Sequence, residues 1–121
     1  MHFTLDISEN VATLGFQEGF LDDREIRALR ESVRALVTEG NTKLVIDLAE
    51  ATHVNSTLIG AMVEIYTSYN KPGRHVVYAR PRDSTKYLLR MLRLDQVFEI
   101  APSLEEALNL LDQPRSSPHP P

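Results

Sequence analysis

The chain has 121 residues, 42% of them apolar, and its 13 basic and 17 acidic side chains give a net charge of −4. This composition suits one compact domain, and the mixed charge provides no broad positive field for nucleic acid or an anionic membrane. The absence of cysteine excludes a disulfide framework, a cysteine-ligated metal site and thiol catalysis. With no run near about 18 apolar residues and no basic-then-apolar start, we expect a cytoplasmic protein without membrane insertion.

The first third of the chain predicts a hairpin followed by a helix. Two short β-prone runs, 2–7 and 11–16, are separated by three polar residues, which favours an antiparallel pair. Apolar residues then recur at helical spacing over 22–37, and Asp22 or Asp23 is available as the N-terminal cap.

The centre of the chain predicts a parallel pair of strands. Residues 44–48 form a nearly continuous apolar run, typical of a strand covered on both faces, and residues 75–79 repeat that character. A helical pattern over 57–69 separates the two runs, so a right-handed crossover is expected.

The apolar stripe of this central helix covers about half of its circumference, more than the roughly 100° of a helix with one buried face. Ile59 and Val63 account for the extra width. Two interpretations stand side by side: these residues face a partner, or they pack against neighbouring helices.

The last third of the chain predicts a helix, a short edge strand and a final helix. The third helix is expected over 84–94 and the strand over 97–100, and Ser103 and Glu106 have capping-box spacing ahead of a helix that begins near Leu104. The apolar residues of helical spacing in the third helix are Tyr87, Leu88, Met91 and Leu92. We expect the folded domain to span 1–112 and the Pro- and Ser-rich segment 113–121 to be disordered.

A basic cluster surrounds the third helix. It predicts either a solvated face or a surface that meets an acidic partner or an anionic ligand. Its members are Arg80, Arg82, Lys86, Arg90 and Arg93.

A pair of hydroxyl side chains stands where the central helix begins, in the sequence Asn55-Ser56-Thr57. A helix start leaves backbone N–H groups unpaired and carries the positive end of the helix dipole, so it accepts a polar cap and tolerates an anion. A phosphate on Ser56 would therefore be accommodated without unfolding the helix. The simpler interpretation is that Asn55 or Ser56 only caps the helix.

The order of elements, with LVIDLAEATHVNSTLIGAMVEIY at its centre, resembles the STAS domain of anti-sigma factor antagonists. In that family an L-V-L-D-L strand leads to an Asp-Ser-Ser/Thr-Gly-Leu-Gly motif, whose first serine matches Ser56, with Thr57 beside it and Gly60 as the later glycine. The resemblance covers about residues 2–111. It includes Phe20-Leu21-Asp22 before the first helix and the segment 80–94.

The resemblance implies an α/β fold with a small mixed sheet of about four to five strands and about four helices. It implies a phosphorylation-controlled switch, in which the unphosphorylated antagonist binds an anti-sigma factor with serine kinase activity and the phosphorylated form lets go. Ser56 would be the phosphoacceptor, with Thr57 as second choice, and Asp22 would lie near it. The expected partner surface comprises Asp22, Asn55, Ser56, Thr57, Leu58, Ile59 and Val63, and a second copy of the chain is a further candidate partner.

Two positions depart from the family pattern, since Asn55 replaces Asp and Leu58 replaces Gly. STAS domains that scaffold signalling assemblies, or that serve as subunits of transport complexes, also vary this motif. A constitutive docking module is therefore the alternative function.

Enzymatic interpretations are weaker. His53 stands three residues before Ser56, but no Gly-x-Ser-x-Gly elbow and no acid to orient His53 is present. The four histidines have no metal-ligand spacing and no Gly-rich phosphate loop is found. We expect neither catalysis nor a metal or cofactor.

Overall fold

The computed structural model describes residues 3–17, 22–52 and 54–113. Within these ranges the chain forms a five-stranded sheet in the order β1-β2-β3-β4-β5, with four α-helices and one short 3-10 helix. The elements in chain order are β1 (Phe3–Ser8), β2 (Val11–Phe16), α1 (Asp23–Thr38), β3 (Lys43–Asp47), α2 (Ser56–Tyr69), β4 (His75–Ala79), α3 (Asp83–Met91), η1 (Leu94–Gln96), β5 (Ile100–Ala101) and α4 (Leu104–Asp112).

The sheet is mixed. β1 pairs antiparallel with β2, and β2, β3, β4 and β5 are parallel to one another. The predicted hairpin and the predicted parallel pair on either side of α2 are therefore confirmed.

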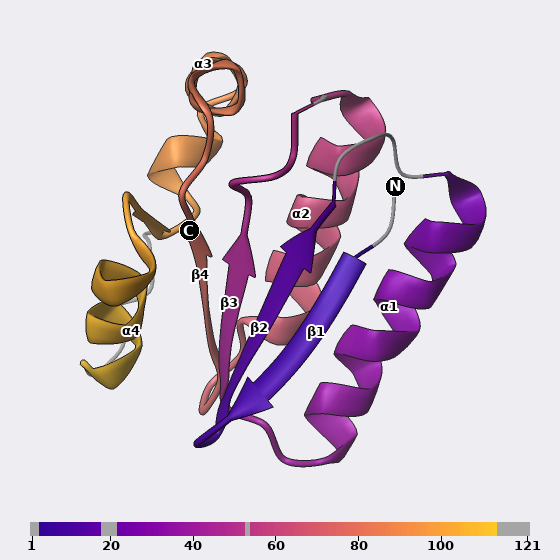
Figure 1. The fold of residues 1–121 in the computed structure, drawn as a ribbon, viewed down its shortest axis with the longest axis vertical. Helices are drawn as coiled ribbons and strands as arrows, with labels where there is room; N and C mark the ends of the chain where they lie inside the picture. The colour runs from indigo at the N-terminus through magenta and orange to yellow at the C-terminus, as the bar shows by residue number, and fades with distance from the viewer. Residues whose placement is uncertain (1–2, 18–21, 53, 114–121) are drawn as a thin grey trace.

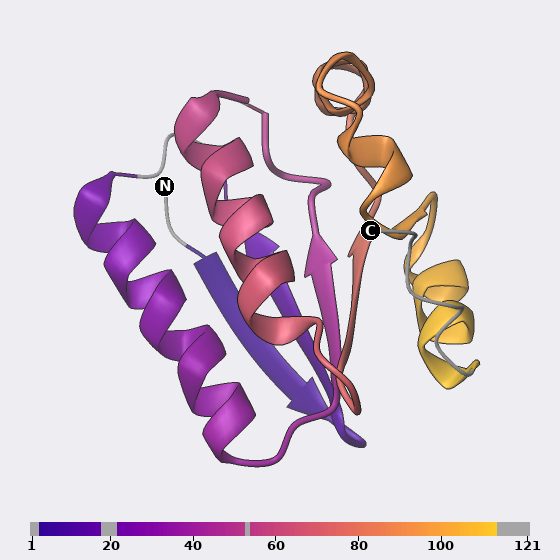
Figure 2. The same cartoon turned by 180° about the vertical axis from the view of Figure 1, so that it is seen from behind.

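Helices cover the two faces of the sheet unequally (Figures 1 and 2). α1 and α2 lie side by side on one face, whereas α4 packs on the other face against β3, β4 and β5. Alternation along β3 divides its side chains between these layers, since Leu44 and Ile46 join the large core under α1 and α2 while Val45 joins the small core under α4. This explains the continuous apolar run in the strand.

Three helices begin with a side-chain cap. Asp22 Oδ1 accepts a hydrogen bond from Glu25 N at 2.8 Å, and Ser103 Oγ accepts one from Glu106 N at 3.1 Å. Asn55 does the same for α2. Each cap satisfies a backbone donor that the first helical turn leaves without an intrahelical acceptor. The predicted starts of α1 and α4 are confirmed, with Asp22 rather than Asp23 as the cap of α1.

The predicted strand over 97–100 is wrong in its extent. Only Ile100 and Ala101 pair with β4, because the chain is still turning before them. Arg93 adopts a left-handed conformation at φ 60°, and Phe98 N donates to Leu94 O at 2.8 Å instead of joining a ladder. Phe98 is then buried against Tyr78, with ring centroids 4.6 Å apart. Burial of this ring takes precedence over strand pairing.

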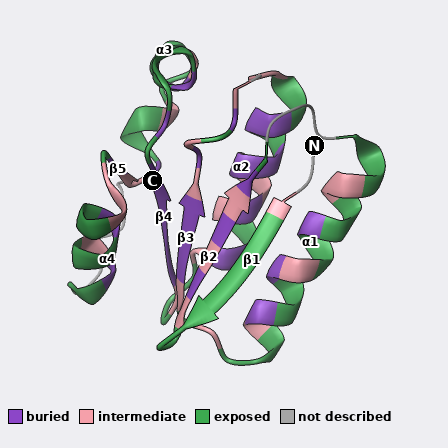
Figure 3. Cartoon of the chain, viewed as in Figure 1, coloured by how far each residue is buried: buried purple, intermediate pink, exposed green. Residues whose placement is uncertain are grey.

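α3 projects from one end of the molecule, and most of its residues are exposed (Figure 3). It spans Asp83–Met91, shorter than the predicted 84–94, and η1 follows it. The predicted tail lies almost entirely outside the described residues, apart from Gln113.

Candidate functional site

Ser56 and Thr57 are exposed at the first turn of α2. Asn55 has an extended backbone, and its Oδ1 accepts a hydrogen bond from Leu58 N at 2.9 Å, so Asn55 is the cap of this helix. Among the described residues the Ser56 and Thr57 hydroxyls have no hydrogen-bond partner. Because Asn55 performs the capping, the Ser56 hydroxyl has no structural task at the helix start.

The wide apolar stripe of α2 is explained by packing. Leu58 and Ile59 are only 1% and 8% exposed, and both belong to the core beneath α1 and α2. Val63 is half-buried and packs against the same core. α2 contacts α1 on one side and the sheet beneath, so about half of its circumference is enclosed. The Leu58 and Ile59 side chains therefore do not form part of an exposed partner surface, contrary to the expectation for these two residues.

Two arginines that follow β4 hold the loop between β3 and α2. Arg80 forms a bidentate ion pair with Asp47, with Nη2 to Oδ2 at 2.5 Å and Nε to Oδ1 at 3.1 Å. Arg82 Nε donates to Ala49 O at 2.7 Å. Within the loop, Asp47 Oδ1 also accepts from Ala49 N, and Ala51 is fully buried. These contacts hold residues 47–49, the first part of the connection that leads to α2.

The hydrogen bond to Asp47 raises the pKa of the Arg80 guanidinium above its ordinary value, so Arg80 stays positively charged. Arg80 itself has a φ of 55°, a left-handed conformation that costs a non-glycine residue about 1 to 2 kcal/mol. The ion pair with Asp47 offsets part of that cost. The sequence places Arg80 in a basic cluster, but nothing in the sequence pairs it with Asp47.

The first turn of α2 contains no acidic residue, whereas those of α1, α3 and α4 each contain at least one. The positive end of its dipole is therefore uncompensated by side chains within the helix itself. A negative group on Ser56 would lie at that end.

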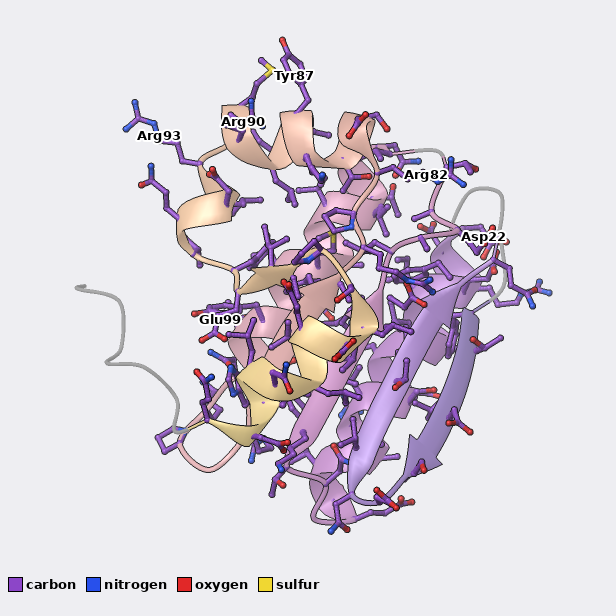
Figure 4. All side chains as sticks on the ribbon, turned by 60° about the vertical axis from the view of Figure 1, so that its left-hand side comes forward. Asp22, Arg82, Tyr87, Arg90, Arg93 and Glu99 are labelled. Atoms are coloured by element: carbon purple, nitrogen blue, oxygen red, sulfur yellow. The ribbon has the colours of Figure 1, made fainter. Side chains whose placement is uncertain are left out.

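Asp22 is positioned at the same edge of the sheet as Ser56, because parallel strands send their following helices back from a shared edge. Figure 4 shows Asp22 at the same end of the molecule as Arg82, the residue that precedes α3. One carboxylate oxygen of Asp22 is used in capping α1. The structure thus brings Asp22, Asn55, Ser56 and Thr57 to one edge, while His53, Phe20 and Leu21 lie outside the described residues.

Within the described ranges, no group of three or more histidine and carboxylate side chains could hold a metal ion. No helix in the same ranges is long and apolar enough to cross a membrane. Buried His75 contacts Glu99, with Nε2 to Oε2 at 2.8 Å, and this pair ties β4 to the segment before β5.

Comparison with known proteins places these features in a family context. The sequence model of the STAS domain matches residues 3–107. An anti-sigma factor antagonist from Mycobacterium paratuberculosis superposes with a TM-score of 0.78 at 21% identity, over 92% of this chain and 93% of that one. An anti-sigma-factor antagonist (STAS) domain protein from Planctomyces limnophilus gives 0.76 at 15% identity, over 93% and 100%. The Bacillus cell fate determinant SpoIIAA in its phosphorylated form gives 0.69 at 14% identity, over 88% and 96%. These matches confirm the predicted fold.

Proposed function

The chain belongs to the STAS domain family, and from this premise we propose that it is an anti-sigma factor antagonist switched by phosphorylation of Ser56. Its partner would be an anti-sigma factor with serine kinase activity, and this chain would act by binding rather than by catalysis. Any nucleotide would then belong to the partner. The likeness to phosphorylated SpoIIAA in fold supports the proposal.

The observation that carries the proposal is the free, exposed hydroxyl of Ser56 beside a separate cap. Asn55 satisfies the helix start, so a phosphate on Ser56 would displace no hydrogen bond among the described residues. A phosphate adds about −1.5 to −2 charges at neutral pH. Near a helix N-terminus each negative charge is stabilised by about 0.3 to 1 kcal/mol. The folded domain would therefore tolerate the modification.

The same phosphate would oppose partner binding. In the unphosphorylated state the partner would contact exposed and half-buried residues around the start of α2. Ser56 belongs to the first turn of α2, so a phosphate on it would project from the helix start into this surface. A bulky, hydrated dianion would then have to be desolvated within the interface, at a cost of several kcal/mol. The residues expected to form this surface are Asp22, Asn55, Ser56, Thr57 and Val63.

Phosphorylation is tested by incubating the protein with anti-sigma serine kinases of its source organism and ATP, followed by peptide mass spectrometry. We expect one phosphate on Ser56, none on Ser56→Ala, and normal modification of the matched control Thr57→Ala. Modification confined to a residue other than Ser56 and Thr57 would contradict the assignment. If Thr57 alone is modified, Thr57 is the phosphoacceptor in place of Ser56.

Binding is tested by calorimetry with the kinase that modifies the chain. The unphosphorylated protein should bind, and phosphorylation or Ser56→Glu should weaken binding by roughly one to two orders of magnitude. Thr57→Ala should retain most of the affinity. Equal affinity of the phosphorylated and unphosphorylated proteins would remove the switch.

A constitutive docking module is the second candidate function. It is favoured by the neutral Asn55 cap, which lacks the negative charge that the family motif places before its phosphoacceptor. In this case Ser56→Ala leaves partner binding intact, while Val63→Glu weakens it. Because Ile59 lies in the core, its substitution would test stability and not docking.

A further inference from the structure

A group of apolar side chains lies exposed on α3 and at its end. Tyr87, Met91 and Leu92 are 61%, 62% and 51% exposed. Of the four residues whose spacing predicted this helix, only Leu88 packs against the core. Three of these four apolar side chains therefore do not pack in the core.

α3 is anchored by a different face. Its fully buried residues are Thr85 and Leu89, one helical turn apart. Tyr87 lies two residues after Thr85, and Met91 lies two residues after Leu89. Two residues correspond to about 200° around a helix. The two exposed apolar side chains thus lie almost opposite the buried pair and point outward, as Figure 4 shows for Tyr87.

Basic side chains flank this exposed stripe. Arg90 lies one turn after Tyr87, and Arg93 follows the end of α3, and Figure 4 shows both projecting from the same end of the molecule as Tyr87. Among the described residues neither arginine takes part in an ion pair. The segment 82–97 carries four basic and two acidic side chains, although the whole chain is acidic at −4. The local charge is opposite in sign to that of the protein.

We propose that this surface, the α3 face, docks an amphipathic segment of a partner protein in which carboxylates flank an apolar stripe. The α3 face is defined as Tyr87, Arg90, Met91, Leu92 and Arg93. Tyr, Met and Arg are the side chains enriched in the buried centres of protein interfaces, and methionine adapts to varied apolar surfaces. The apolar stripe matches a protein better than a nucleic acid backbone. The proposal is independent of phosphorylation at Ser56.

Charge selects this occupant over a second copy of the chain. Two α3 faces packed about a two-fold axis would bring basic segments of equal sign together, which is unfavourable. A carboxylate-flanked segment instead places opposite charges at the rim of an apolar contact. The net excess of basic side chains in 82–97 therefore favours an acidic partner.

The test uses two 18-residue helical peptides that share one leucine stripe, with glutamates flanking it in one peptide and lysines in the other. Titration of the isotope-labelled full chain, followed by amide NMR, should shift residues 87–97 with the glutamate peptide. That peptide should bind roughly tenfold more tightly than the lysine peptide. Arg90→Glu with Arg93→Glu should reverse the preference, and Tyr87→Ser with Met91→Ser should weaken binding of both peptides.

The matched control reverses two exposed charges elsewhere, Arg24→Glu with Arg27→Glu on α1, and should leave the preference unchanged. All the substituted side chains are exposed, so thermal unfolding should report an intact fold for each variant. The proposal is overturned if neither peptide binds, if both bind equally, or if shifts are confined to the groove between α1 and α2 lined by Val33, Val37 and Ile65. Concentration-dependent shifts of α3 without peptide would assign the face to a second copy instead.

Discussion

Substitution of Asn55 separates its capping role from the charge that the family usually places there. Asn55→Ala removes the 2.9 Å hydrogen bond to Leu58 N and leaves that donor without its side-chain acceptor. The expected loss is about 1 kcal/mol of unfolding free energy. For a domain of this size that loss lowers the Tm by roughly 4 °C. Asn55→Ser keeps an acceptor and should lose much less.

Asn55→Asp keeps the acceptor and adds a negative charge at the helix N-terminus. At neutral pH this should stabilise the unphosphorylated protein by about 0.3 to 1 kcal/mol. Once Ser56 carries a phosphate, the two adjacent negative charges repel each other, so phosphorylation should destabilise Asn55→Asp relative to the parent. The order of stabilities is thus expected to invert on phosphorylation.

Both effects are measured by denaturant and thermal unfolding of the unphosphorylated and phosphorylated forms. Asn109→Ala is the control, because Asn109 is exposed within α4 and has no hydrogen bond of its side chain among the described residues. It should be neutral or slightly stabilising. An Asn55→Ala protein as stable as the parent, or an Asn55→Asp protein that is less stable before phosphorylation, would refute this account of the helix start.

Three further predictions concern stability. Both Arg80→Ala and Arg80→Gly lose the ion pair with Asp47, but only glycine adopts the left-handed backbone without steric cost, so the alanine variant should be less stable by about 1 kcal/mol. Hydrogen exchange at residues 49–51 should accelerate in both variants. Equal stabilities of the two variants would rule out the backbone contribution. Burial raises the pKa of Tyr69 to about 12, so the unfolded state ionises first and stability should fall as pH rises from about 10 to 12. In Tyr69→Phe the unfolding free energy should fall less steeply over this pH range. The fall that remains is attributed to Tyr78, whose pKa burial also raises. An unchanged dependence of unfolding free energy on pH would exclude a contribution from Tyr69. The buried Thr85 hydroxyl has no hydrogen-bond partner among the described residues. Thr85→Val should therefore raise the unfolding free energy, measured by denaturant titration, by about 1 kcal/mol. A clear decrease in unfolding free energy would indicate that the hydroxyl has a hydrogen-bond partner.

Helix starts and strand character could be predicted from the sequence because they depend on neighbouring residues. The cap of α4 is a hydrogen bond between Ser103 and Glu106, which are three residues apart in the sequence, and this spacing alone predicts it. In α1 the residues Leu29, Val33 and Leu36 recur at helical spacing and are all buried. The position of Ser56 at the start of α2 follows from the same kind of local pattern.

The burial of α2 and α3 could not be read in the same way. The wide stripe of α2 left open whether Ile59 faces a partner, and contact with both α1 and the sheet places it in the core. In α3 the apolar spacing through Tyr87 and Met91 predicts the helix but does not identify its buried side. Which side is buried depends on where the helix meets the rest of the molecule.

The order of elements, the polar caps and a hydroxyl pair at the start of α2 follow from the sequence alone, since each rests on interactions within a few residues. Only the tertiary structure joined Asp47 to Arg80 across 33 positions of sequence and placed Ile59 in the core. It also turned the apolar stripe of α3 toward solvent. These outcomes depend on the parallel register of β3 and β4 and on the placement of helices against the sheet, which bring together side chains that no local pattern connects.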